Sequence, residues 1–296
     1  MNNASPLKKI LITGGTGQVG FELQRSLMLH GQILAPSRQQ LDLTSAAAVD
    51  AWLETQQPDL IINAAAYTAV DLAETEQQQA LRLNAELPEQ LARYCQQRKI
   101  GLVHYSSDYV YPGSGTEPWQ EDSATGPKNH YGQSKLLGDS AVERASIDYL
   151  IFRTSWVYSA RGNNFMETML RLGKERASLN VVDDQIGVPT PARLIAQVTE
   201  RAISHNLASG VYHLAPRGQC SWQEFAHSIF QQAQAEGVPL AITPAKVQGI
   251  PSTDYPTPAA RPLNSRLSLS KLENALEIEL PDWQSQLTLT LKEYMA

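Results

Sequence analysis

A tyrosine and a lysine that would lie one helical turn apart are the residues of this chain best suited to chemistry. Tyr131 and Lys135 are four positions apart in the segment HYGQSK. On a helix that spacing puts both side chains on one face. A free phenol has a pKa of about 10, and a nearby ammonium favours the phenolate, which brings the pKa closer to the working pH for proton transfer. The pair therefore suits proton transfer at Tyr131, although such pairs also occur by chance in many helices.

A glycine-rich turn near the N-terminus gives this pair a context. The apolar run 9–13 breaks into glycines: Gly15, Gly17 and Gly20 fit GxGxxG, and Gly14, Gly17 and Gly20 fit GxxGxxG. Glycine permits a tight turn from strand to helix and lets backbone N–H groups approach a pyrophosphate, whose charge a helix N-terminus favours. Similar turns also serve as plain connectors, so the loop predicts dinucleotide binding only together with its surroundings.

The elements that would position these residues alternate between strand and helix patterns. The expected strands cover 9–13, 32–36, 60–63 and 101–105, and the intervening helices include one that follows Ser45 and a long helical pattern at 71–97, broken near Pro88. This order predicts an α/β fold with a doubly wound, Rossmann-type parallel sheet and ligands at the carboxyl ends of its strands. After residue 153 the alternation weakens, and we expect helices at 192–202, 221–236 and 283–295 and a strand at 210–214.

Composition narrows the class of protein. The chain has 296 residues, 42% of them hydrophobic, and a net charge of -6, which argues against nucleic acid as the main partner. Cys95 and Cys220 are far apart, which suits a reducing compartment and predicts no disulfide framework. The leader at 1–6 is short and polar, and no apolar run approaches the roughly 20 residues that span a bilayer. We therefore expect a cytoplasmic protein with no membrane partner.

Cofactor choice depends on the end of the second expected strand. An NAD-binding domain usually places Asp or Glu there for the ribose 2′-OH, but this chain has Ser37 and Arg38. A hydroxyl and a permanently charged guanidinium suit a 2′-phosphate, so we expect NADPH, with NADH as the alternative. Arg38 could instead be an ordinary surface residue, and Asp42 could contact the adenine end or cap the next helix.

Several further motifs carry a family resemblance over nearly the whole chain. They are SSDYVY at 106–111, RTSWVY at 153–158, NNF at 163–165, GVPT at 187–190 and ARPLNSR at 260–266. Together with the glycine turn and the Tyr131–Lys135 pair, they resemble the extended short-chain dehydrogenase/reductase superfamily and, within it, the dTDP-4-dehydrorhamnose reductases.

The resemblance implies a reaction and its catalytic residues. NADPH would reduce the C4 carbonyl of dTDP-4-dehydro-L-rhamnose to give dTDP-L-rhamnose. Tyr131 would protonate the alkoxide, Lys135 would hold the nicotinamide ribose and tune the phenol, and Ser107 would hydrogen-bond the substrate oxygen. Ser106 could be mistaken for Ser107, but alternation along a strand would turn the two side chains opposite ways.

The resemblance also implies the binding residues and the domains. For the cofactor these are Gly14, Gly17, Gln18, Val19, Ser37, Arg38, Asp42, Leu43, Ala64, Ala65, Ala66, Tyr67, Thr68, Tyr131 and Lys135; for the nucleotide sugar they are Ser107, Asp108, Trp156, Asn164 and Arg261. Trp156 is either a core residue or a platform against the deoxysugar, and Arg261 could equally form a surface ion pair. Residues 1–155 would bind NADP, with 191–214 returning to that domain. Residues 156–190 and 215–296 would mainly form a smaller C-terminal substrate-binding domain, whose segment 250–262 is expected to cover the sugar.

Metal binding is not expected. The histidines lack ligand spacing. Some relatives are held as dimers by magnesium at clustered glutamates; Glu22 matches one such position, but Arg193 stands where another carboxylate would be. We therefore expect no metal requirement, and a monomer or weak homodimer.

Three rival functions are weighed against reduction. A dehydratase of the family would carry Glu where Tyr109 stands, and an epimerase would retain NAD, which Ser37 and Arg38 disfavour. The third is a non-catalytic, NADP-binding regulatory subunit, similar to the beta subunit of methionine adenosyltransferase. Turnover of NADPH with the sugar nucleotide would separate these functions.

Overall fold

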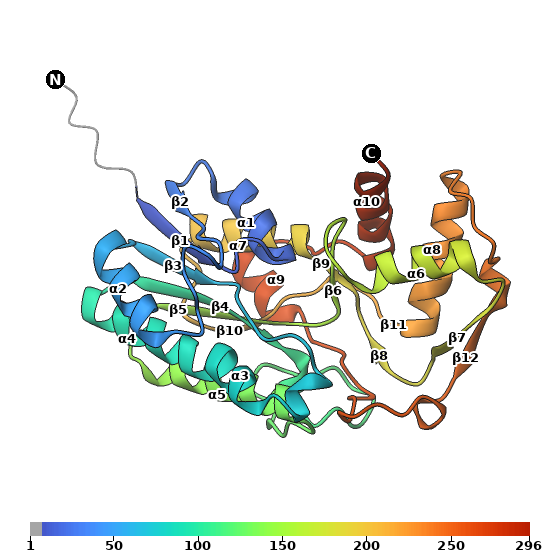
Figure 1. The fold of residues 1–296 in the computed structure, drawn as a ribbon, viewed down its shortest axis with the longest axis horizontal. Coiled ribbons are helices and arrows are strands. Elements are labelled where there is room, and N and C mark those ends of the chain that lie inside the picture. The colour runs from blue at the N-terminus through green and yellow to red at the C-terminus, as the bar shows by residue number, and fades with distance from the viewer. Residues whose placement is uncertain (1–7) are drawn as a thin grey trace.

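A six-stranded parallel sheet lies at the centre of the larger part of the molecule (Figure 1). The structure is a computed structural model that describes residues 8–296, so the expectation for the leader at 1–6 lies outside it. The strands are β1 (Lys9–Thr13), β2 (Gln32–Leu34), β3 (Leu60–Asn63), β4 (Gly101–Ser107), β5 (Tyr149–Thr154) and β10 (Gly210–His213), in the order β10-β5-β4-β3-β1-β2. Every neighbouring pair is parallel, which confirms the predicted sheet.

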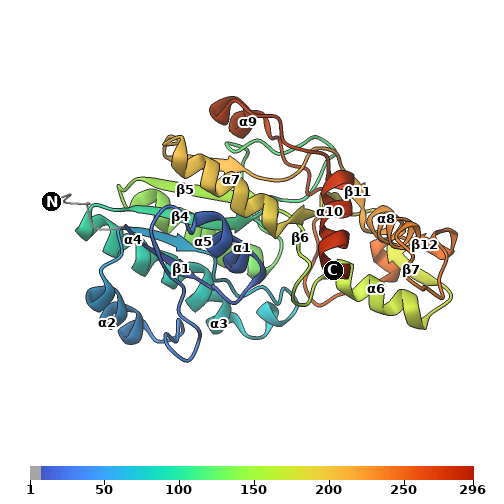
Figure 2. The ribbon, with the colours of Figure 1, turned by 90° about the horizontal axis from the view of Figure 1, so that it is seen from above.

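Helices cover both faces of this sheet (Figures 1 and 2). One face packs against α1 (Gln18–Leu27), α7 (Ala192–Ser204) and α9 (Ser270–Leu276); the other packs against α2 (Ala46–Gln56), α4 (Leu87–Arg98) and α5 (His130–Arg144). Alternation along β1 divides the two cores, because Ile10 and Ile12 enter the first and Leu11 enters the second. The sheet therefore holds both layers of helices by buried apolar side chains on each face.

Two boundaries differ from the sequence prediction. The second strand ends at Leu34 rather than at residue 36. The helical stretch expected at 71–97 begins with a 3₁₀ turn (Leu72–Glu74), and then α3 (Gln77–Leu81), a π-helical turn (Arg82–Glu86) and α4 follow one another. Pro88 does not break it, because proline lies in the first turn of α4, where its missing N–H costs little.

A second group of elements has its own apolar core. It contains α6 (Phe165–Glu175), α8 (Trp222–Ala235), α10 (Trp283–Met295), β6 (Val157–Tyr158), β7 (Leu179–Val182), β8 (Ile186–Gly187), β9 (Thr190–Pro191), β11 (Cys220–Ser221) and β12 (Val247–Ile250). The short strands pair as β6 with β9, β7 with β12 and β8 with β11. Buried Phe225, Phe230 and Trp283 dominate this core. Figure 2 shows these elements at one end of the molecule, beyond the sheet.

The elements predicted in the second half are confirmed. α7, α8 and α10 match the helices expected at 192–202, 221–236 and 283–295, and β10 matches the strand expected at 210–214. α7 and β10 return to the sheet, where β10 pairs with β5. No helix within residues 8–296 is long and apolar enough to span a bilayer.

Candidate active site

The glycine loop passes against the end of β3 with almost no space between the two backbones. Gly14 has a φ of +67°, and a Cβ on it would stand 2.8 Å from the carbonyl oxygen of Ala64 and from the amide nitrogen of Ala65. A Cβ on Gly20 would stand 2.2 Å from the carbonyl oxygen of Gly14. Only glycine fits these contacts, so the loop can turn from β1 into α1 close to the residues that follow β3.

The N-terminus of α1 is open to a negative charge. Gly17 is its N-cap, no side chain caps the helix, and its first turn holds no acidic residue. The first N–H groups of a helix lack partners inside the helix and carry partial positive charge. Gln18 and Val19 follow directly, so this end can take a phosphate of a dinucleotide.

The predicted adenine end lies after β2. Arg38 is exposed and Ser37 is half-buried. The Asp42 carboxylate accepts hydrogen bonds from the backbone N–H and the hydroxyl of Thr44, while Ser45 caps α2. Asp42 is thus used locally just before the helix, and any contact of Asp42 or Leu43 with a cofactor stays a prediction.

The small residues after β3 form an open strip. Ala64, Ala65 and Ala66 are half-buried and Thr68 is exposed. Tyr67 is fixed, because its backbone N–H donates to Asn84 Oδ1 at 2.8 Å. The strip lies beside the glycine loop at the carboxyl ends of β1 and β3, which is where a doubly wound sheet binds its ligands.

Tyr131 and Lys135 lie on the first turns of α5. Asn129 caps this helix by accepting from the N–H of Gly132, and Tyr131 packs edge-on against Tyr109 with 5.4 Å between ring centroids. Lys135 is buried, and its ammonium donates to the carbonyl oxygen of Tyr105 at 2.6 Å. The helix thus presents the phenol beside the end of β4 and holds the amine beneath it.

The expectation that Lys135 lowers the pKa of Tyr131 is wrong for the protein alone. Burial raises the pKa of Tyr131 to about 12, and the Ser107 hydroxyl opposes that rise. Burial also lowers the pKa of Lys135 to about 8, which the Asp139 carboxylate opposes. Removal from water therefore dominates both pKa values, because the phenolate and the ammonium each lose their hydration.

Ser107 and Asp108 end β4 next to this helix. The Ser107 hydroxyl donates to Asp108 Oδ1 at 3.0 Å and accepts from the N–H of Tyr109 at 3.2 Å. Ser106 lies on the opposite side of the strand, towards Asp139, whose pKa is raised by burial against the opposing charge of Arg153. Burial raises the pKa of Asp108 to about 6, and its Oδ2 has no hydrogen-bond partner among the described residues.

Trp156 is half-buried and lies in the second group of elements. It adopts a φ of +48° and stacks on Trp222, with ring centroids 3.7 Å apart and an angle of 16° between the rings. A Cβ on Gly187 would come within 2.9 Å of the Trp156 ring. Its orientation is therefore fixed by neighbours, and its role as a platform for the sugar stays a prediction.

The other two predicted substrate residues make contacts within the chain. Asn164 caps α6, and its amide donates to Gln18 Oε1 at 3.2 Å, which joins α6 to the glycine loop. Arg261 pairs through Nη2 with Asp71 at 2.7 Å, whereas its buried Nη1 has no partner among the described residues. The ion pair that the sequence left open thus exists, and a contact of Arg261 with the nucleotide sugar stays a prediction.

Three residues near the site were not singled out in the sequence. Asn84, Trp222 and Asp71 fix Tyr67, Trp156 and Arg261 respectively. No spacing in the sequence reveals them, because each contact joins residues 17 to 190 positions apart through the tertiary fold.

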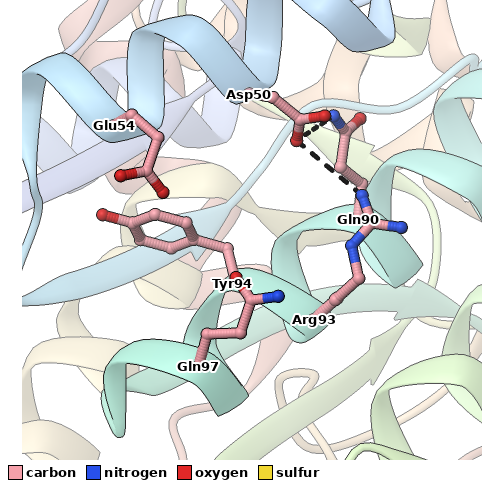
Figure 3. Close-up of a pocket in the computed structure, with 6 residues that line it drawn as sticks. All are labelled: Asp50, Glu54, Gln90, Arg93, Tyr94 and Gln97. Carbon is pink, nitrogen blue, oxygen red and sulfur yellow. Dashed lines mark hydrogen bonds and ion pairs between the residues drawn. The ribbon is translucent and has the colours of Figure 1, made fainter.

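A surface depression between α2 and α4 does not belong to this site. Figure 3 shows its lining residues, Asp50, Glu54, Gln90, Arg93, Tyr94 and Gln97. Three of them pair with one another: Gln90 donates to Asp50 at 2.7 Å, and Arg93 lies 3.8 Å from the same carboxylate. None of the predicted catalytic or binding residues lines it.

The acidic position at Glu22 does not fit a magnesium ion. Arg193 lies 3.8 Å from Glu22 and 2.5 Å from Glu293, and Arg25 lies 3.1 Å from Glu293. Two guanidinium groups therefore occupy the space around both carboxylates. Within residues 8–296, no three His, Cys, Asp or Glu side chains are grouped to hold a metal ion.

Comparison with known proteins places this geometry in a family. The model of the RmlD substrate binding domain matches residues 8–296. The chain is 44% identical over 292 residues to a dTDP-4-dehydrorhamnose reductase of Escherichia coli K12, covering 96% of this chain and 97% of that protein. It is 43% identical to the reductase of Burkholderia thailandensis, covering 97% and 99%.

Solved structures give the same answer. A dTDP-4-dehydrorhamnose reductase of Bacillus anthracis in complex with NADP superposes with a TM-score of 0.90 at 35% identity, covering 97% of this chain and 99% of that one. The Clostridium acetobutylicum protein gives a TM-score of 0.89 at 33% identity, covering 97% and 100%. With an open helix N-terminus at a glycine loop and a Tyr131–Lys135 pair at the end of β4, the chain belongs to the RmlD substrate-binding family, together with these dTDP-4-dehydrorhamnose reductases.

Proposed function

We propose that this protein is an NADPH-dependent dTDP-4-dehydrorhamnose reductase. It reduces the C4 carbonyl of dTDP-4-dehydro-L-rhamnose to the alcohol of dTDP-L-rhamnose, a nucleotide sugar for cell-surface polysaccharide. The observation that carries the proposal is the placement of Tyr131, Lys135 and Ser107 together at the carboxyl end of β4. The names of the relatives and the NADP in the Bacillus anthracis protein support the same substrate and cofactor.

The residues divide the reaction between them. NADPH supplies the hydride when it is bound. Ser107 donates a hydrogen bond to the carbonyl oxygen, and Tyr131 gives its proton to that oxygen as negative charge develops there. Lys135 is the cation that stabilises the phenolate left on Tyr131. Asp108, next to Ser107, contacts a sugar hydroxyl.

Binding follows the same assignment of residues. The glycine loop and the N-terminus of α1 take the pyrophosphate, Ser37 and Arg38 take the 2′-phosphate, and residues 42–43 and 64–68 line the adenosine and ribose. Arg261 offers its free Nη1 to the nucleotide diphosphate. Trp156 and Asn164 complete the sugar side.

We assign residues 1–155 and 191–214 to an NADP-binding domain and residues 156–190 and 215–296 to a substrate-binding domain. The separate apolar cores of the two groups of elements support this division. A monomer or weak homodimer working in the cytoplasm is the state that we propose.

Replacing the proton donor tests the function. Purified protein is mixed with NADPH and dTDP-4-dehydro-L-rhamnose, and loss of the reduced nicotinamide absorbance is followed. Tyr131→Phe should lower kcat by about 10²- to 10⁴-fold, the usual value of a general acid, while NADPH still binds. Tyr109→Phe is the matched control, because it removes a neighbouring phenol and keeps its ring against Tyr131.

Two outcomes would reject the proposal. A Tyr131→Phe protein with undiminished kcat would remove the phenol from the reaction. A wild-type protein that binds NADPH but never oxidises it with this sugar would favour the regulatory-subunit alternative.

A further inference from the structure

Four ionisable side chains are buried together beneath the catalytic helix. His104, Lys135, Asp139 and Arg153 are each between 0% and 4% exposed. Charges removed from water are costly unless they are paired. Each charged group in such a cluster therefore needs a partner of opposite charge.

Only one of the two carboxylate oxygens of Asp139 is hydrogen-bonded within residues 8–296. Its Oδ2 accepts from Arg153 Nε at 3.0 Å, whereas its Oδ1 has no hydrogen-bond partner among the described residues. Arg153 has further acceptors, since its Nη1 donates to the Tyr111 hydroxyl at 2.9 Å. Arg153 is thus held by several groups, and one oxygen of the Asp139 carboxylate is left with capacity for another positive charge.

His104 is not that charge. Its Nε2 lies 3.8 Å from Asp139 Oδ1, but its Nδ1 faces the amide of Asn63 at 3.1 Å, and Asn63 accepts from the Thr13 hydroxyl at 2.6 Å. An amide donor on one ring nitrogen leaves that nitrogen without a proton. Burial and the nearby Lys135 together hold the pKa of His104 well below its usual value, so its ring is neutral.

Lys135 is the remaining cation. It precedes Asp139 by four positions on α5, so both side chains lie on the face that packs against β4 and β5. Its only hydrogen bond in the described structure goes to a neutral backbone carbonyl, that of Tyr105. Asp139 is the one acidic group whose charge raises the pKa of Lys135.

Other titratable groups around Asp139 do not replace it. The phenols of Tyr111 and Tyr131 have pKa values raised to about 12 by burial and are neutral at working pH. Glu143, one turn further along α5, is exposed, and the Ser106 hydroxyl of β4 carries no charge.

We propose that Asp139 is a positioning residue for the reaction: held by Arg153, its carboxylate is the buried counter-charge that keeps Lys135 an ammonium. The role rests on the proposed function, in which Tyr131 becomes a phenolate when it gives up its proton. A neutral amine beneath the phenolate would leave that charge unpaired in a site removed from water. Asp139 acts through Lys135 and touches no reacting atom.

The pH profile of kcat/KM tests this role. In the wild type, kcat/KM for reduction should fall above about pH 8, where Lys135 loses its proton. Asp139→Asn removes the counter-charge, so this alkaline limb should move to lower pH by about one unit, within the range that a buried neighbouring charge produces. At pH 8.5 the variant should then be about 10-fold less active than the wild type, and at pH 6 nearly equal.

Two further variants make the result decisive. Glu143→Gln removes an exposed carboxylate from the same helix and should leave the limb in place. Asp139→Asn combined with Arg153→Met removes both members of the buried pair, so no guanidinium is left without its carboxylate. Lys135 still loses its counter-charge in this variant, so the alkaline limb should again move to lower pH than in the wild type.

The remaining outcomes would contradict either the role of Asp139 or the proposed function. A limb that stays at its wild-type pH in a folded, active Asp139→Asn or double variant overturns the proposal. It is overturned equally if neither variant folds, because the carboxylate would then serve the fold alone. Absence of turnover in the wild type would instead reject the proposed function, so the two failures can be told apart.

Discussion

Asp108 is the least favourably placed carboxyl among the candidate site residues. It is 2% exposed, and its Oδ2 has no hydrogen-bond partner among the described residues. Burial raises its pKa to about 6, compared with about 4 for an unfolded Asp. A carboxyl whose pKa is raised on folding contributes stability below the unfolded pKa and loses it as the pH rises through the folded pKa.

We expect this loss of stability to be measurable as the pH rises. Between about pH 4 and pH 6, Asp108 should reduce the free energy of unfolding by up to about 3 kcal/mol, the equivalent of a shift of about two pKa units. Asp108→Asn removes the titration, so the variant should gain stability relative to the wild type at pH 8 but not at pH 4. Urea unfolding at both pH values measures the difference, and an equal difference at the two would contradict it.

Residue types and spacing identified the candidate catalytic side chains but not their pKa values. Tyr131 and Lys135 could be named because four positions make about one helical turn. The family resemblance selected Ser107, and strand alternation turned Ser106 the other way. The pKa of Tyr131 could not be predicted, because it depends on burial by residues distant in sequence. Asn164 shows the same limit: its type suits a ligand contact and a helix cap equally, and only the structure shows that it caps α6.

At the scale of elements, α5 packs directly on the π-helical turn Arg82–Glu86. Gly138 faces that turn, and a Cβ on it would stand 2.1 Å from the carbonyl oxygen of Asn84. Asn84 in turn donates to the Ser134 hydroxyl of α5 at 3.0 Å and accepts from the Tyr67 backbone. The catalytic helix α5 therefore packs directly against the turn Arg82–Glu86, which is hydrogen-bonded to Tyr67 after β3.

Gly138→Ala tests this seating. The added methyl group meets backbone, which cannot rotate away, so we expect a loss of about 1 to 3 kcal/mol in the free energy of unfolding, as for other overpacked sites. Gly101→Ala is the control, because its nearest contact for a Cβ is an ordinary 3.6 Å. Urea midpoints compare the two, and equal losses would show that α5 does not depend on this close approach.

The π-helical turn also explains why the predicted break at Pro88 was wrong. Periodicity correctly predicted helical structure around Pro88, and the rule that proline interrupts a helix placed a break there. The chain instead inserts its irregular turn just before Pro88, so the proline falls in the first turn of α4. Short apolar runs predicted β1, β3 and β4 well, whereas the two-residue strands β6, β8, β9 and β11 are too short to have a pattern.

At the scale of the whole molecule, α10 connects the two apolar cores. Its buried Trp283, Leu287 and Leu291 belong to the core of the second group of elements. Near its C-terminal end, Glu293 pairs with Arg25 of α1 and Arg193 of α7, which cover the sheet. No local signal predicts these pairs, because their members are 268 and 100 positions apart in the sequence.

Because of these ion pairs around Glu293, we expect the enzyme to need no divalent cation for activity or assembly. Glu22 and Glu293 carry two negative charges, and Arg25 and Arg193 already balance them within one chain. A cation entering here would have to displace two guanidinium groups that cannot lose their charge near neutral pH. Incubation with EDTA should therefore leave kcat and the sedimentation coefficient unchanged, and magnesium added afterwards should alter neither. A smaller species after EDTA, restored by magnesium, would show that a metal holds chains together despite these arginines.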